Sequence, residues 1–161
     1  MAVDIFLKLD GITGESTDSQ HRGEIDLDSW SFGESNAAAH TGGGGAGRVS
    51  MQDIHVTGKT SIASPQLMLA CATGKHIKDG QITVRKAGVA GKGGLEFLVI
   101  KFKLVLITSV QETGHSGDDG PTESITFAFE AIEIKYTEQN ADGGAGAASD
   151  FTWDLKTNRV V

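Results

Sequence analysis

Residues 95–110 read LEFLVIKFKLVLITSV, and this stretch gives the strongest structural signal in the 161-residue chain. Its even positions are apolar in an unbroken series, namely Leu98, Ile100, Phe102, Leu104 and Leu106. A period of two residues is typical of a β-strand with one buried face, and we expect this series to be that face. Such a strand would be far longer than the usual ~5 to 6 residues.

A second long stretch, residues 123–136, follows a turn of sequence TGHSGDDGP at residues 113–121. Its apolar positions are odd up to Phe129 and even from Ile132 onward, which indicates a bulge near Glu130. The two stretches therefore predict a long β-hairpin.

Shorter patterns of period two predict further strands, at residues 3–9, 24–32, 49–56, 82–84 and 151–155. In the second of these the apolar face shifts between Leu27 and Trp30, which implies a bulge near Asp28 and Ser29. The sequence thus predicts a mainly β fold, an antiparallel barrel or sandwich in a single domain over residues 1–161.

One helix is expected to flank the sheet, in the segment SPQLMLACAT at residues 64–73. Ser64 is the expected N-cap, Pro65 occupies the first helical position, and Gly74 follows the expected last turn.

A glycine run, HTGGGGAGRV at residues 40–49, separates two predicted strands and indicates a long extended loop. Its four consecutive glycines, Gly42, Gly43, Gly44 and Gly45, lose more conformational entropy on ordering than other residues. We therefore expect the loop to become ordered against a partner. Acidic residues predominate before residue 41 and after residue 110 and basic residues between them, a segregation compatible with self-association or with charges that simply mix in the folded chain.

Several functional classes are disfavoured by composition and spacing. The net charge of −7 argues against nucleic-acid binding, no apolar run is long enough for a membrane span, and the first residues do not resemble a signal peptide. The single cysteine, Cys71, lies among apolar neighbours, and the five histidines share no ligand spacing. The glycine run lacks the helix that a phosphate-binding loop requires. We expect no catalytic residue, no cofactor, no metal site and no enzymatic activity.

Five motifs together resemble haemolysin co-regulated protein (Hcp), the tube-subunit family of bacterial type VI secretion. They are MAVDIFLKLDGITGES, EIDLDSWSFG, HTGGGGAGRVSMQD, SPQLMLACATGKH and ITVRKAG, in the order of the family. The resemblance implies a β-barrel subunit with a flanking helix that forms a homo-hexameric ring, and rings that stack into a tube. It also implies a contractile sheath and a VgrG-type spike protein as partners. Assembly would take place in the cytoplasm, and the protein would be exported by the type VI machine to the extracellular space or a target cell without a signal peptide.

The resemblance also implies site residues. The glycine loop would contact a neighbouring subunit through Gly42, Gly43, Gly44, Gly45 and Arg48. Alternation in WSF places Trp30 and Phe32 on one face and Ser31 on the other, so that Ser31 faces either the lumen and its small effector proteins or plain solvent.

Two other classes remain open at this stage. A monomeric barrel for a small apolar ligand would use the face from Leu98 to Leu106 to line its cavity. An enzyme built from scattered Ser, His and Asp residues would need a site that local spacing does not show.

Overall fold

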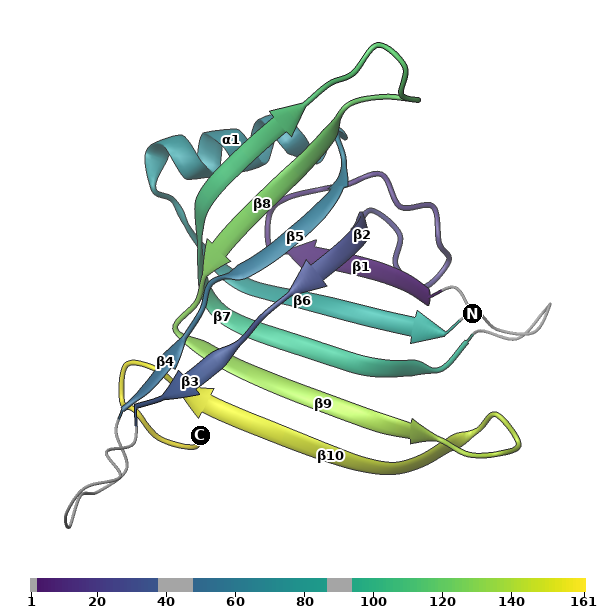
Figure 1. Cartoon of the computed structure of the whole chain (residues 1–161), viewed down its shortest axis with the longest axis vertical. Coiled ribbons are helices and arrows are strands. Elements are labelled where there is room, and N and C mark those ends of the chain that lie inside the picture. The colour runs from purple at the N-terminus through teal and green to yellow at the C-terminus, as the bar shows by residue number, and fades with distance from the viewer. Residues whose placement is uncertain (1–2, 38–47, 87–93) are drawn as a thin grey trace.

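The computed structural model describes residues 3–37, 48–86 and 94–161. Within these ranges the chain forms ten strands and one helix (Figure 1). Their bounds are β1 Val3–Leu9, β2 Ile25–Ser31, β3 Glu34–Asn36, β4 Val49–Met51, β5 Ile54–Lys59, α1 Ala63–Thr73, β6 His76–Lys86, β7 Glu96–Thr113, β8 Thr122–Ala128, β9 Ala131–Gln139 and β10 Ala145–Asp154.

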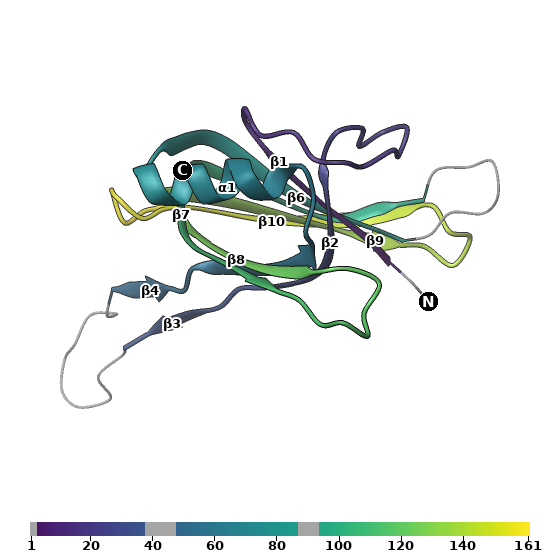
Figure 2. The same ribbon diagram turned by 90° about the horizontal axis from the view of Figure 1, so that it is seen from above.

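The strands form an antiparallel barrel, as the sequence predicts. Hydrogen-bonded neighbours run in the order β7, β6, β1, β2, β5 and β8, and β8 pairs with β7 again to close the barrel. β9 pairs with the N-terminal half of β7 and β10 pairs with β9, so these two strands extend beyond the barrel; we call them the wing. β3 and β4 pair only with each other and project away from the barrel as an arm (Figures 1 and 2).

The long hairpin is also confirmed. β7 pairs with β9 from Leu98 to Lys103 and with β8 from Leu106 to Thr113 in one continuous hairpin. The expected interruption near Glu130 is present, because β8 ends before it and β9 begins after it. The register shift lies on the other strand, between Ile107 and Ser109.

The prediction that the even positions of β7 form its buried face is wrong beyond Phe102. Leu104 has a φ of 51° and is 44% exposed, whereas Val105 and Ile107 are buried. The left-handed conformation at Leu104 interrupts the alternation of the strand. The buried positions are therefore even before Leu104 and odd directly after it. Residues 104–107 are all apolar, and periodicity alone therefore does not reveal the change.

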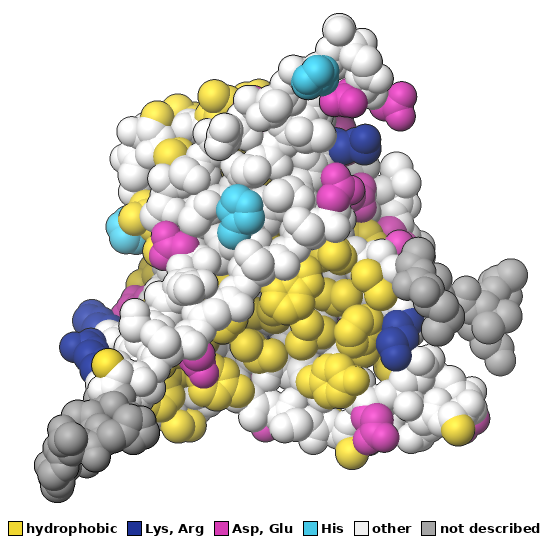
Figure 3. All heavy atoms as spheres, viewed as in Figure 1, with side chains coloured by type: hydrophobic (Ala, Val, Ile, Leu, Met, Phe, Trp, Pro, Cys, Tyr) yellow, Lys and Arg dark blue, Asp and Glu magenta, His cyan; other side chains and the backbone are white. Residues whose placement is uncertain are grey.

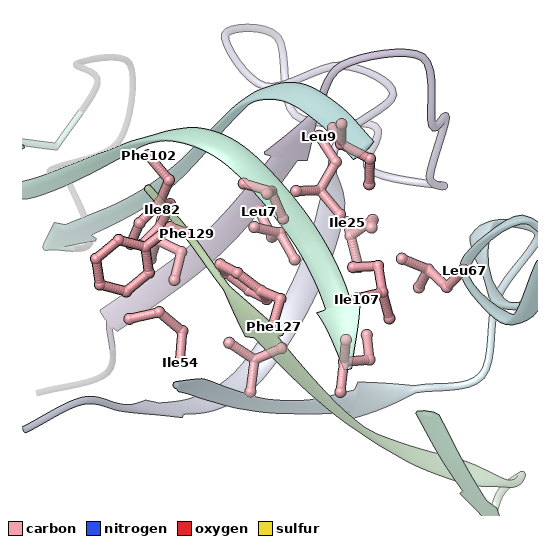
Figure 4. Close-up of a cluster of buried hydrophobic side chains, with 14 of the residues drawn as sticks. Leu7, Leu9, Ile25, Ile54, Leu67, Ile82, Phe102, Ile107, Phe127 and Phe129 are labelled. Atoms are coloured by element: carbon pink, nitrogen blue, oxygen red, sulfur yellow. The ribbon is translucent and has the colours of Figure 1, made fainter. Parts of the chain in front are cut away.

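One hydrophobic cluster fills the barrel (Figure 4). Phe102 and Phe127 meet edge to face with their ring centroids 5.2 Å apart, and both side chains are buried. Leu67 reaches the same cluster from α1. The apolar face of β7 thus packs against other side chains. Such a face more commonly packs in a filled core than lines a ligand cavity.

Helix α1 ends where predicted but begins differently. Gly74 has a φ of 66° and terminates the helix, with the backbone N–H of Lys75 donating to the carbonyl of Ala70. Ile62, not Ser64, holds the N-cap position, and Ser64 lies buried in the first turn. Within the described ranges, no helix has the length and apolar character needed to cross a bilayer.

Candidate functional site: a hydroxyl-lined face of the barrel

Ser31 lies on the outward side of β2, as alternation predicts. Its neighbours Trp30 and Phe32 are partly buried and pack against the core, whereas Ser31 is exposed. The predicted bulge just before it is confirmed by a register shift between Leu27 and Ser29. The bulge moves Trp30 to the core side, and Ser31 therefore faces outward.

Ser31 belongs to a row of polar residues that crosses four strands. Ser31 is opposite His55 of β5, His55 is opposite Thr126 of β8, and Thr126 is opposite Ser109 of β7. Residues directly opposite in antiparallel strands project to the same side of the sheet. The structure thus places residues 78 positions apart in the sequence on a single surface.

A second row runs beside the first across the same strands, from Ser29 through Thr57 and Ser124 to Gln111. We call the two rows together the hydroxyl face. Its members are Ser29, Ser31, His55, Thr57, Ser109, Gln111, Ser124 and Thr126.

The hydroxyl face carries hydrogen-bonding groups and no carboxylate, ammonium or guanidinium group. The hydroxyls of Ser29 and Thr57 are bonded to each other, and Nδ1 of His55 lies 3.2 Å from the hydroxyl oxygen of Thr126. Hydroxyl groups both donate and accept, so this surface can bond to polar groups of either kind. Over β5 and β8, Figure 3 shows a surface with few charged side chains.

The outward face of the neighbouring strands is charged by contrast. One row there runs from Lys8 through Gln81 and Lys101 to Glu133 across β1, β6, β7 and β9. The lack of such charges is therefore a property of the hydroxyl face and not of the whole barrel exterior.

The wing exposes part of the apolar layer. Leu7, Ile82 and Ile100 are buried inside the barrel, but the same row continues through Ile134 to Phe151 on the wing, where both are only partly buried.

Next to this row, Tyr136 is 47% exposed and its ring meets that of Phe97 edge to face at 6.3 Å. Figure 3 shows a hydrophobic area in the hollow over β6, β7 and β9. A contiguous apolar patch of this kind marks an interaction surface.

The predicted interface loop is described only at its end. Gly42, Gly43, Gly44 and Gly45 lie outside the described residues. Arg48, at the end of the arm farthest from β2 and β5, donates from Nη2 to the backbone carbonyl of Leu155, at 3.2 Å. This bond ties the far end of the arm to the segment after β10.

A buried polar cluster near the N-terminus was not predicted from the sequence. His21 is buried with its ring stacked on Phe6 at 4.2 Å, and its two ring nitrogens lie 2.8 and 2.7 Å from carboxylate oxygens of Glu24 and Glu96. Phe6 and Glu96 are distant from His21 in the sequence, so local spacing does not indicate these two contacts.

Arg85 of β6 makes a second polar cluster, which shares Phe6 with the first. Its guanidinium lies over the Phe6 ring and donates to Asp18 and Asp4. The hydrogen bonds from Arg85 lower the pKa of Asp18 to about 2.

In the part of the chain that the structure describes, no group of three or more His, Cys, Asp or Glu side chains is arranged to hold a metal ion. His55 contacts the hydroxyl of Thr126 within the hydroxyl face. The hydroxyl face and the exposed apolar patch of the wing are suited to binding or assembly.

Comparisons with known proteins agree with this geometry. The family model described as "Type VI secretion system effector, Hcp" matches residues 6–136. The protein hcp1 of Pseudomonas aeruginosa is 41% identical over 161 residues, covering 98% of each chain. A solved type six secretion system protein superposes with a TM-score of 0.90 at 29% identity, covering 98% of this chain and 99% of the other. Hcp1 from Salmonella typhimurium superposes with a TM-score of 0.80 at 31% identity, covering all of both chains. The chain therefore belongs to the Hcp family, the tube subunits of bacterial type VI secretion.

Proposed function

We propose that the chain assembles into six-membered rings that stack into the inner tube of a type VI secretion machine. The exposed apolar row on the wing carries this proposal. Ile134 and Phe151, with Tyr136 beside them, continue the core layer past the edge of the barrel. Covering such a row stabilises an assembly by roughly 25 cal/mol for each Å² of apolar surface removed from water. In a ring, a neighbouring copy of the chain would cover this apolar surface.

Native mass spectrometry tests the assembly. The expected species has six times the 16.9 kDa mass of the chain and appears as an open ring in negative stain. Tyr136→Asp should break the ring into smaller species, because a carboxylate cannot be buried in an apolar interface without a partner. Leu69→Asp is the matched control, since Leu69 is also exposed in the single chain, at 65% against 47% for Tyr136, but lies on α1. A wild-type chain that stays monomeric at micromolar concentration would overturn the proposal.

The hydroxyl face is proposed to line the lumen of the ring. Ser31 lies in its first row, and the uncharged hydroxyls there would bind small effector proteins without imposing a charge on them. Such binding would protect an effector before export. The role is structural, and no chemical step is assigned to Ser31 or His55.

Effector binding tests this assignment. Ser31→Tyr should weaken retention of a small effector by the ring and leave the six-fold mass unchanged, because the added ring occupies space above the face. Ser116→Tyr is the control, since Ser116 is exposed in the turn between β7 and β8, away from the face. Equal retention by wild type and Ser31→Tyr would refute the lumen assignment.

The glycine loop is proposed to contact the neighbouring subunit through Gly42, Gly43, Gly44, Gly45 and Arg48. Support comes from the arm, which projects from the barrel and leads into the loop at Arg48. Deleting residues 41–47 should lower the thermal stability of the assembly or change its state. An unchanged assembly of unchanged stability would contradict this contact.

The remaining partners follow from the same proposal. A contractile sheath would surround the tube, a VgrG-type spike would cap it, and the subunit would pass from the cytoplasm to the outside when the sheath contracts. Export that stops when sheath contraction is blocked is the expected result.

A further inference from the structure

Two glutamates face each other across the β7–β8 hairpin beside the start of α1. Glu112 of β7 is directly opposite Glu123 of β8. Glu123 is only 2% exposed, and on its other side the residue opposite is Gly58 of β5, which has no side chain. Two like charges directly opposite in an antiparallel pair repel each other, more strongly when water is excluded. The position of the pair therefore needs a compensating group.

Each carboxyl group accepts one hydrogen bond and leaves one oxygen unbonded. The hydroxyl of Ser64 in α1 donates to Oε2 of Glu123 at 2.7 Å, and the hydroxyl of Thr60 donates to Oε2 of Glu112 at 2.6 Å. The Oε1 atoms of both glutamates are buried without a hydrogen-bond partner. A buried acceptor without a partner costs free energy, and two ionised carboxylates offer each other no donor.

Among the described residues no basic side chain compensates the pair, since neither glutamate forms an ion pair there. Thr60 and Ser64 are uncharged, the helix Ala63–Thr73 contains no charged residue, and the neighbouring Lys59 is exposed. A proton on one carboxyl would remove one charge and supply the missing donor.

We propose that Glu112 and Glu123 hold one proton between them in the native chain, and that this protonated pair fastens the first turn of α1 to the β7–β8 hairpin through Ser64. The fastening connects β5, α1 and the β7–β8 hairpin, since Thr60 follows β5 and Ser64 lies in the first turn of α1. Loss of the proton places two negative charges opposite each other and weakens the attachment of α1 to the β7–β8 hairpin.

The acid–base behaviour of the pair agrees with this. Burial, together with the neighbouring Glu112, raises the pKa of Glu123 to about 7 from the usual 4.5. A raised pKa means that the native state binds a proton which the unfolded chain releases. The resulting stability is fully present below about pH 4.5 and is lost as the pH rises through about 7. The full shift corresponds to at most a roughly 300-fold change in the ratio of native to unfolded chain.

Denaturant unfolding of the full-length protein between pH 5 and 8, at one protein concentration, tests the proposal. The wild-type midpoint should fall as the pH rises. In Glu123→Gln the amide replaces the protonated carboxyl, so this decline should be smaller. Glu138→Gln, at an exposed position in β9, is the matched control and should keep the wild-type decline. Equal declines in wild type and Glu123→Gln would overturn the proposal.

A second measurement needs no variant. Carboxyl carbon chemical shifts in the wild-type protein should show one glutamate titrating near pH 7, and two ordinary titrations would refute the shared proton. The denaturant unfolding of the wild type is then repeated with calcium and with a chelator. If calcium stabilises the wild type at pH 7 and the chelator removes the effect, a cation and not a proton holds the pair, which also overturns the proposal.

Discussion

Replacement of Leu67 by alanine measures how strongly α1 is held against the barrel. Leu67 is 0% exposed and reaches from α1 into the core cluster (Figure 4). The three carbon atoms removed contribute roughly 2 kcal/mol, at about 0.8 kcal/mol for each buried CH₂ group. The cavity that remains raises the expected loss of unfolding free energy to about 3–5 kcal/mol. In a chain of this size, that loss corresponds to a decrease in Tm of about 6–20 °C.

Urea unfolding followed by fluorescence of Trp30 and Trp153 gives the free energy directly. All variants are compared at one protein concentration, because an assembled ring adds to apparent stability by mass action. Leu69→Ala is the matched control, since Leu69 lies on the same helix but is 65% exposed, and its loss should stay within about 0.5 kcal/mol. A loss below about 1 kcal/mol for Leu67→Ala, or equal losses for both variants, would refute the reasoning that α1 is held by this buried side chain.

Two further predictions concern backbone strain and charge. Leu104 has a φ of 51°, so Leu104→Gly should be more stable than Leu104→Ala by about 1 kcal/mol, the reverse of the usual order in a strand; urea midpoints of the two variants measure this, and a more stable alanine variant would argue against the left-handed conformation. Arg85 lowers the pKa of Asp18 to about 2, so the advantage of wild type over Arg85→Met should be present above pH 3.8 and should disappear as the pH falls toward 2. Unfolding between pH 2 and 6 checks this, and an advantage independent of pH would show that the ion pair with Asp18 does not supply it.

Alternation in the sequence was enough to predict most of the strands, because a strand with one buried face repeats every two residues. The bulge before Ser31 was predictable for the same reason, since Leu27 and Trp30 are both apolar but lie three positions apart, an odd offset that would put them on opposite faces of a regular strand. The change of phase at Leu104 was not predictable, because residues 104–107 are all apolar and fit either phase. The conformation of one residue decided the outcome there.

The orientation of Ser31 was predictable, but its neighbours were not. His55, Thr126 and Ser109 join Ser31 only through the pairing of β2 with β5, β5 with β8, and β8 with β7. These pairings depend on long-range packing. The one local indication is that uncharged polar residues alternate with apolar ones in both β5 and β8. Ser64 shows the same limit, since it was assigned as a helix cap and instead bonds to Glu123, 59 residues away.

The proposed ring contact and the proposed lumen depend on one strand. The N-terminal half of β7 pairs with the wing, and its C-terminal half carries Ser109 and Gln111 of the hydroxyl face. Leu104, which has a left-handed backbone conformation, lies between the two halves. The buried positions are even before it and odd directly after it. Because both halves belong to one hydrogen-bonded hairpin, the wing and the hydroxyl face are held at a fixed angle to each other. A contact made by the wing in a ring therefore also sets the direction of the hydroxyl face, and a subunit built in this way needs no separate element to orient its lumen.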